Sequence, residues 1–208
     1  MLPVPPLTAT TSDSGRSRLL VASSMAESGS SNAPNYFLTT TRVGFRPWTE
    51  NDIGLALALW GDPEVSRFID SRGVLNVAEV KQKLNAELQS QAEYGIQYWP
   101  IFLKENGEHV GCCGVRPKDI NNGVMEFGVH LRRDYWGSGL AAEASRAAID
   151  YAFAHLHAKE LFAGHNPQNK ASRHLLQKLG FVYIGDEFYP PTGLLHPSYT
   201  LSRLAVTT

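Results

Sequence analysis

Six residues, Trp136-Gly-Ser-Gly-Leu-Ala141, constrain the fold of this chain more than any other stretch, because they join two different periodicities. The apolar run at 124–131 is typical of a strand, and the alanine-rich pattern after the turn predicts a helix from Gly139 to about His155. A glycine turn between a strand and a helix leaves backbone NH groups unpaired at the positive end of the helix dipole. The sequence therefore predicts a strand–turn–helix unit that is able to bind a phosphate or pyrophosphate.

The remaining periodicities predict a single mixed α/β domain. Segments typical of strands lie at 40–48, 96–104, 109–115, 124–131, 160–165, 181–188 and 198–205. Helical patterns lie at 53–60, 77–88, 139–155 and 169–179. Thr49 is expected to cap the first helix, and Gly180 to end the last one. Because strands come first and then alternate with helices, we expect a mixed sheet of about seven strands with helices on its faces.

The first part of the chain has a different composition. Residues 1–36 are rich in Ser, Thr, Gly, Asn and Pro, so they are predicted to form a flexible tail outside a domain at 37–208. A secretory signal is not expected, since the basic start and the long apolar run of such a signal are missing. A transit peptide is the alternative, because the first 24 residues hold two arginines and one aspartate.

Charge and cysteine content exclude several classes of protein. A net charge of −1 over 208 residues leaves no broad basic surface for nucleic acid, and no apolar run approaches the ~20 residues that span a bilayer. Cys112 and Cys113 are neighbours on a predicted strand, where side chains alternate between faces, so we expect no bridge and a reducing, cytoplasmic location. No Cys/His cluster has the spacing of metal ligands, so no metal is expected.

Three motifs follow one another in a recognisable order. They are the strand entry at 42–47, the glycine turn at 136–141 with Glu143-Ala144, and Asn169-Lys-Ala-Ser172 with Lys178-Leu-Gly-Phe181. Together they resemble the GNAT superfamily of N-acetyltransferases, in the RimJ/RimL-like branch that acts on the N-termini of ribosomal proteins. The superfamily usually has Arg or Gln where Trp136 stands, whereas this branch often has Trp. The resemblance implies a mostly antiparallel sheet with a splayed central pair of strands.

The resemblance also implies acetyl-CoA as the acetyl donor. Its pyrophosphate would bind the backbone of the glycine turn, formed by Trp136, Gly137, Ser138, Gly139, Leu140 and Ala141. Gly137 and Gly139 lack a Cβ, so the backbone there is able to approach the phosphates closely. A backbone NH near the end of the preceding strand, at Val129, His130 or Leu131, would stabilise the developing oxyanion.

Two polar residues of the third motif have both a structural and a functional interpretation. Asn169 stands where a helix begins, so it is either an N-cap or a ligand of the pantetheine arm, and both roles are compatible. Ser172 faces the same side one turn later, and the resemblance implies that its hydroxyl protonates the departing thiolate. Many superfamily members have a tyrosine four residues further on, where this chain has Leu176, so that role falls to Ser172 or to water.

The general base is the part of the site that the sequence defines least. Glu126 lies in the middle of the strand beside the expected acetyl site and is the first candidate, with a surface carboxylate as the alternative. His196, in a late loop, is a second candidate, and Glu187 is a weaker third. Glu143 is interpreted as structural, with Arg146 as its expected partner.

These observations predict an acetyl-CoA-dependent N-acetyltransferase that acts by direct attack in a ternary complex. The acceptor is expected to be a protein N-terminus or a small-molecule amine, and the enzyme a monomer or homodimer. Acceptor contacts are expected from the loop at 68–74, the second helix and the loop at 189–196. A CoA-binding regulatory or scaffold domain without catalysis is the alternative, since the base is undefined and the tyrosine at Leu176 is missing.

Overall fold

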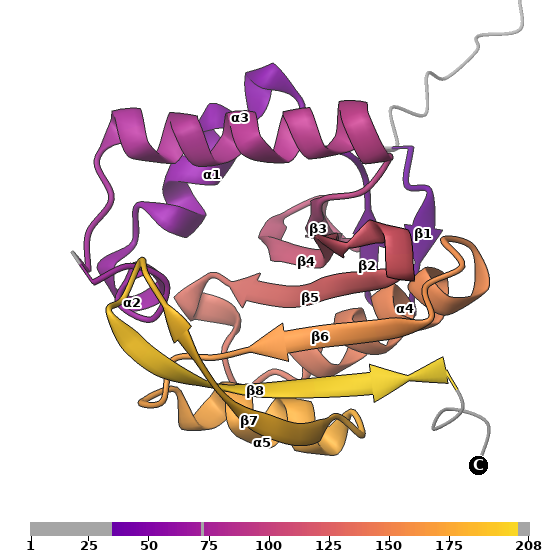
Figure 1. Ribbon diagram of the computed structural model, residues 1–208. Helices are drawn as coiled ribbons and strands as arrows, with labels where there is room; N and C mark the ends of the chain where they lie inside the picture. Colours follow the sequence, from indigo (N-terminus) through magenta and orange to yellow (C-terminus); the bar gives the residue numbers. More distant parts are fainter. Residues whose placement is uncertain (1–34, 72, 204–208) are drawn as a thin grey trace, which may run out of the picture. The chain divides into compact units, whose positions relative to one another are not determined.

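The computed structural model describes residues 35–71 and 73–203, and its centre is one twisted sheet (Figure 1). The sheet has the order β1-β2-β3-β4-β5-β6-β8-β7 in the described residues. Its strands are β1 (Leu38–Thr39), β2 (Val43–Phe45), β3 (Tyr98–Leu103), β4 (His109–Asp119), β5 (Val124–Leu131), β6 (Glu160–Gly164), β7 (Val182–Tyr189) and β8 (Leu194–Ser202). All neighbouring strands pair antiparallel except β5 and β6. The predicted mixed, mostly antiparallel sheet is therefore confirmed.

Helices cover both faces of this sheet, as predicted (Figure 1). They are α1 (Ile53–Trp60), α2 (Pro63–Ser66), α3 (Val77–Tyr94), α4 (Leu140–Ala154) and α5 (Lys170–Lys178). One core joins α1, α2 and α3 to Cys112, and the other joins α4 and α5 to Cys113. The two cysteines thus point to opposite faces, and both are free and buried.

The ends of the helices follow from side chains that satisfy unpaired backbone groups. Asn76 accepts a hydrogen bond from the NH of Glu79 and Glu79 bonds back to Asn76, which starts α3. Gly95 ends the same helix in the left-handed region, with a φ of 72°. Thr49 forms the corresponding box with Asp52, so a short 3-10 turn, Glu50–Asp52, leads into α1.

The central pair of strands, β5 and β6, separates along its length. Their pairing covers only three residues, Val124–Glu126 against Glu160–Phe162, although β5 continues to Leu131. The splayed strand pair that the resemblance implied is therefore present in the sheet. Its consequence is an open edge of β5 in the middle of the domain.

Several boundaries differ from the prediction: β4 continues to Asp119 instead of 115, and α3 continues to Tyr94 instead of 88. The single strand expected at 40–48 is a hairpin of β1 and β2, because Thr40 bonds the backbone of Val43 and turns the chain between them; eight strands result instead of seven. The last strand starts at Leu194, since it pairs with the whole of β7, so His196 lies on β8 and not in a loop. Helix α2 was not predicted, although Asp62 caps it and Pro63 opens it.

The predicted tail at 1–36 lies outside the described residues except for its last two positions, so it stays a prediction. Within 35–71 and 73–203, none of the helices combines the length and the apolar character that crossing a bilayer requires.

Candidate active site

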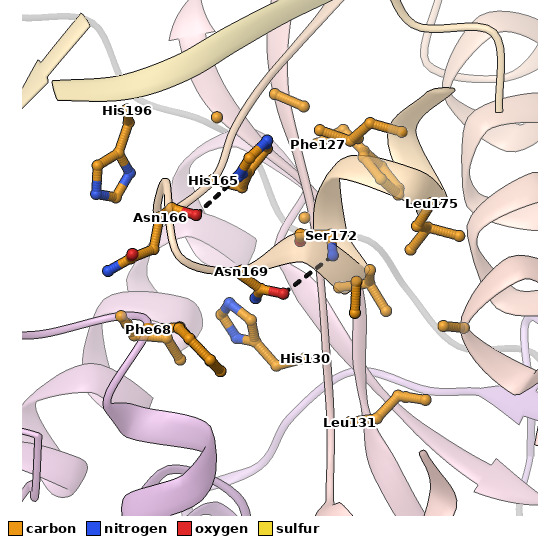
Figure 2. Close-up of a pocket in the computed structure, with 18 of the residues that line it drawn as sticks. Phe68, Phe127, His130, Leu131, His165, Asn166, Asn169, Ser172, Leu175 and His196 are labelled. Carbon is orange, nitrogen blue, oxygen red and sulfur yellow. Dashed lines mark hydrogen bonds between the residues drawn. The ribbon is translucent and has the colours of Figure 1, made fainter. Parts of the chain in front are cut away.

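A cavity of about 650 Å³ lies where β5 and β6 separate (Figure 2). Its walls come from both strands, the turn before α4, the first turns of α5, and parts of α3, β7 and β8. Most of the predicted site residues line it: Glu126, Val129, His130, Leu131, Trp136, Gly137, Gly139, Ala141, Asn169, Ser172 and His196. Ser138 and Leu140 do not line it. Leu140 is instead 3% exposed, and it anchors the start of α4 in the core.

The open edge of β5 supplies backbone donors to this cavity. The NH of Arg132 donates to the carbonyl of Val110 on β4, at 2.9 Å. Since hydrogen-bonded and non-bonded positions alternate along an antiparallel pair, the NH groups of Leu131 and Val129 point away from β4. They point to the side from which β6 has diverged, whereas the NH of His130 faces β4. Two NH groups of the predicted oxyanion stretch are therefore directed at the cavity.

The glycine turn before α4 has the features of an anion site. Gly137 and Gly139 have φ angles of 75° and 80°, values that favour glycine. Within the described chain, the NH groups of Gly137, Ser138, Gly139 and Ala141 have no hydrogen-bond acceptor. Free NH groups at a helix start and a backbone without Cβ atoms form an anion site. Trp136 holds the turn to β5 by donating from Nε1 to the carbonyl of Leu131, at 2.9 Å.

Glu143 has a structural role, as predicted, but its partner is not Arg146. Its carboxylate accepts from the hydroxyl of Thr40 and from both the backbone and the Nε of Arg42, the last at 2.6 Å. Burial works against ionisation, but these hydrogen bonds hold the pKa of Glu143 below its usual value. Arg42 also donates to the carbonyl of Ser138, so the β1–β2 hairpin supports the glycine turn. The prediction of Arg146 rested on its position three residues after Glu143 on the same helix. That spacing does not reveal a partner such as Arg42, which is distant in the sequence.

Asn169 is the N-cap of α5. Its Oδ1 accepts from the NH of Ser172 at 3.0 Å, a bond that Figure 2 shows at the cavity wall. The interpretation of Asn169 as an N-cap is thus confirmed. Because Asn169 also lines the cavity, the predicted contact with the pantetheine arm stays a prediction. Ser172 is half-buried beside it. Leu176, where other superfamily members have tyrosine, is 4% exposed and packs in the core, so it offers no proton donor.

Glu126 lies at the other end of the cavity, beside an aromatic side chain from β3. Its Oε1 accepts a hydrogen bond from the phenol of Tyr98, at 3.1 Å. Gly128 makes room for this phenol, because a Cβ at that position would overlap the Tyr98 ring. Burial first, and then the charge of Glu126, raises the pKa of Tyr98 well above its ordinary value. Tyr98 therefore stays protonated and orients the carboxylate of Glu126.

Sequence reasoning missed the cations that line the cavity, among them Lys83 and Arg116. Arg116 pairs with the fully buried Glu87 and stacks over Tyr98, with 4.0 Å from its guanidinium carbon to the ring centroid. Arg116 is directly opposite Glu126 in the β4–β5 register. The strand was predicted to end at 115, and a prediction that extended it by one residue would have placed Arg116 beside Glu126. Lys83 was detectable from its position on the stripe of α3 that carries Val80 and Leu84, both buried.

The histidines of the cavity are held neutral by their surroundings. Burial, followed by the charges of Lys83 and Arg116, lowers the pKa of His130 well below its ordinary value. Trp60 donates to Nδ1 of His130 at 3.2 Å, which leaves the proton on the other nitrogen. Burial also lowers the pKa of His196, whose Nε2 lies 2.7 Å from the Thr192 hydroxyl.

Comparison with known proteins identifies the fold and its chemistry. The family model described as an Acetyltransferase (GNAT) domain matches residues 42–182, a span that contains the glycine turn and both strands of the splayed pair, β5 and β6. The chain belongs to the GNAT acetyltransferase family. It is thus an acetyl-CoA-dependent acyltransferase, as predicted from the motifs.

Some relatives of this acetyltransferase have a named activity, and others are uncharacterised. It is 32% identical over 148 residues to the "Uncharacterized protein YkkB" of Bacillus subtilis (strain 168), covering 70% of this chain and 85% of that one. It is 34% identical over 144 residues to the spermidine N(1)-acetyltransferase of Escherichia coli (strain K12), covering 69% and 75%. The structure of Mycobacterium smegmatis RimJ in complex with CoA-disulfide matches with a TM-score of 0.67 at 18% identity, covering 80% and 84%. At that identity the match shows a shared fold.

Proposed function

We propose that this acetyltransferase moves the acetyl group of acetyl-CoA directly to a primary amine while both substrates are bound. One observation supports this above all others: the anion site of the glycine turn, the open edge of β5 and the carboxylate of Glu126 border the same cavity. Donor and acceptor would thus meet without a covalent enzyme intermediate. Holding two reactants together in this way supplies much of the rate of such reactions.

Different backbone groups along the cavity bind the cofactor and stabilise the transition state. The NH groups of Gly137, Gly139 and Ala141 bind the pyrophosphate of acetyl-CoA, which supplies the acetyl group as a thioester. The NH groups of Val129 and Leu131 donate to the thioester oxygen as negative charge develops on it. Each donor of this kind contributes about 3 kcal/mol to the stabilisation of a transition state.

Proton transfer completes the reaction. The acceptor amine must lose a proton before it attacks, and Glu126, oriented by Tyr98, receives that proton directly or through water. We favour Glu126 over His196, because Nε2 of His196 is engaged by Thr192 and the residue as a whole is 7% exposed. Ser172 gives a proton to the departing thiolate, since Leu176 has none to give.

The finer assignments follow from similarity. The fold shared with Mycobacterium smegmatis RimJ and the tryptophan at position 136 support a place in the RimJ/RimL-like branch. The relationship to a spermidine N(1)-acetyltransferase supports a small amine as acceptor. A cytoplasmic location and a monomeric or homodimeric state are part of the same proposal.

The test is acetyl transfer from acetyl-CoA across a panel of amines and peptide N-termini, with CoA release and the acetylated product measured together. Glu126→Gln should lower kcat at least tenfold. Glu187→Gln is the matched control, because Glu187 also lines the cavity but pairs with Lys118. Tight binding of acetyl-CoA with no transfer to any acceptor would contradict the proposal and favour the regulatory alternative.

A further inference from the structure

The acceptor end of the cavity has an unusual balance of charge. Five cations line the cavity: Lys170, next to Asn169 at the start of α5, and Arg67, Lys83, Arg116 and Lys118 on other elements. Three of them have a carboxylate partner, in the pairs Arg67–Glu64, Arg116–Glu87 and Lys118–Glu187. Lys83 forms no ion pair with any residue in the described part of the chain. Among the cations of the wall in the described residues, Lys83 and Lys170 therefore have no ion pair, and Lys83 is the one that lies away from the start of α5.

Lys83 is not a surface lysine extended into water. It is half-buried on α3, and its ammonium lies 5.5 Å from the centre of the Trp60 ring. Burial, followed by the charge of Arg116, lowers the pKa of Lys83. The charges of Glu87 and Asp70 oppose this shift without forming an ion pair with Lys83. Burial of a cation costs free energy, and an anionic ligand in contact with Lys83 would offset more of that cost.

Glu126 is the complementary group on the sheet. It accepts from Tyr98 and forms no ion pair with a described residue, although Arg116 is opposite it in the register. The cavity thus presents one cation, Lys83, and one carboxylate, Glu126, that form no ion pair within the described part of the chain. The ligand that complements both carries a positive and a negative group.

We propose that the acceptor is a small amino acid, whose amine binds at Glu126 and whose carboxylate binds at Lys83. This inference rests on the proposed function and narrows its acceptor class. Phe68, Ile69 and Tyr189 line the same end of the cavity, so an apolar side chain on the amino acid fits there. A polyamine fits poorly, because its second ammonium would meet cations.

The experiment compares pairs of acceptors that differ only in the carboxylate: leucine with 3-methylbutylamine, and phenylalanine with 2-phenylethylamine. Spermidine and peptides that begin with leucine or glutamate complete the set. The amino acid should have the higher kcat/KM in each pair, by about ten- to a hundredfold, the range of one charged hydrogen bond. Lys83→Gln should remove that advantage and leave kcat/KM for the matched amine within about threefold.

Lys81→Gln is the matched control, because Lys81 is exposed on the same helix and does not line the cavity. Preference for spermidine or for the decarboxylated amines would overturn the inference, as would an equal loss with both acceptors in Lys83→Gln. Acetylation of the peptides but not of the free amino acids would also overturn it. Calorimetric binding of leucine and 3-methylbutylamine to the enzyme–CoA complex tests the charge match separately. If leucine binds better and no acceptor is acetylated, the proposed function fails while the charge match stands.

Discussion

Substitution of Gly139 by valine separates the role of the glycine turn in folding from its role in binding. Gly139 has a φ of 80°, where a residue with a Cβ loses about 1–2 kcal/mol of stability. A Cβ there would lie 3.5 Å from Nη2 of Arg42, an ordinary contact, so the protein itself accommodates the added atom. For a domain of this size the backbone strain lowers Tm by about 2–8 °C.

The effect on acetyl-CoA should be much larger than the effect on stability. The valine side chain blocks the approach of the pyrophosphate to the NH groups of the turn. Each charged hydrogen bond lost costs about 1.5–3 kcal/mol, so the Kd should rise about ten- to a hundredfold for each bond. Calorimetric titration with acetyl-CoA and thermal unfolding on the same samples measure the two quantities.

Gly107→Val is the matched control for this experiment. Gly107 lies in the β3–β4 turn with a φ of 73° and open space where a Cβ would stand, and it does not line the cavity. It should lose a similar amount of stability and bind acetyl-CoA with unchanged affinity. Equal Kd values for the two variants would refute the assignment of the glycine turn as the pyrophosphate site.

Three further predictions concern single side chains. Ser172→Ala should lower kcat about tenfold or more and change the acetyl-CoA Kd little; an equal loss in both would reduce Ser172 to a binding contact. Gly128→Ala should displace the phenol of Tyr98 from Glu126 and lower kcat with acetyl-CoA affinity unchanged, and an unchanged kcat would argue against this orienting bond. Burial lowers the pKa of His109 to about 4. As pH falls, His109 is protonated in the unfolded chain near pH 6.5 but in the folded protein only near pH 4. The free energy of unfolding should therefore decrease by about 3 kcal/mol in total between pH 6.5 and 4. Urea unfolding of His109→Phe should show a flatter pH dependence, and an unaltered slope would contradict this origin.

Local patterns predicted most of the elements because each rests on residues near one another in sequence. Helix α1 and strand β5 have the predicted bounds, since the capping box at Thr49 and the turn glycine Gly123 mark their starts. The glycine turn and the N-cap at Asn169 were also predictable, because each depends on residues within a few positions of one another. The first strand was wrong because a side chain-to-backbone bond at Thr40 decides between a strand and a hairpin.

The sequence by itself determined the fold class and predicted a donor site and candidate carboxylates, because hydrophobic period, turn glycines and helix caps act over a few residues. Only the tertiary structure decided which of those groups meet. The orienting bond of Tyr98 to Glu126 joins β3 to β5, and the support of the glycine turn by Arg42 spans almost a hundred residues of chain. The position of Lys83 beside three cations that do have carboxylate partners became visible in the same way. Charge balance in a cavity depends on packing between distant elements, which no local pattern records.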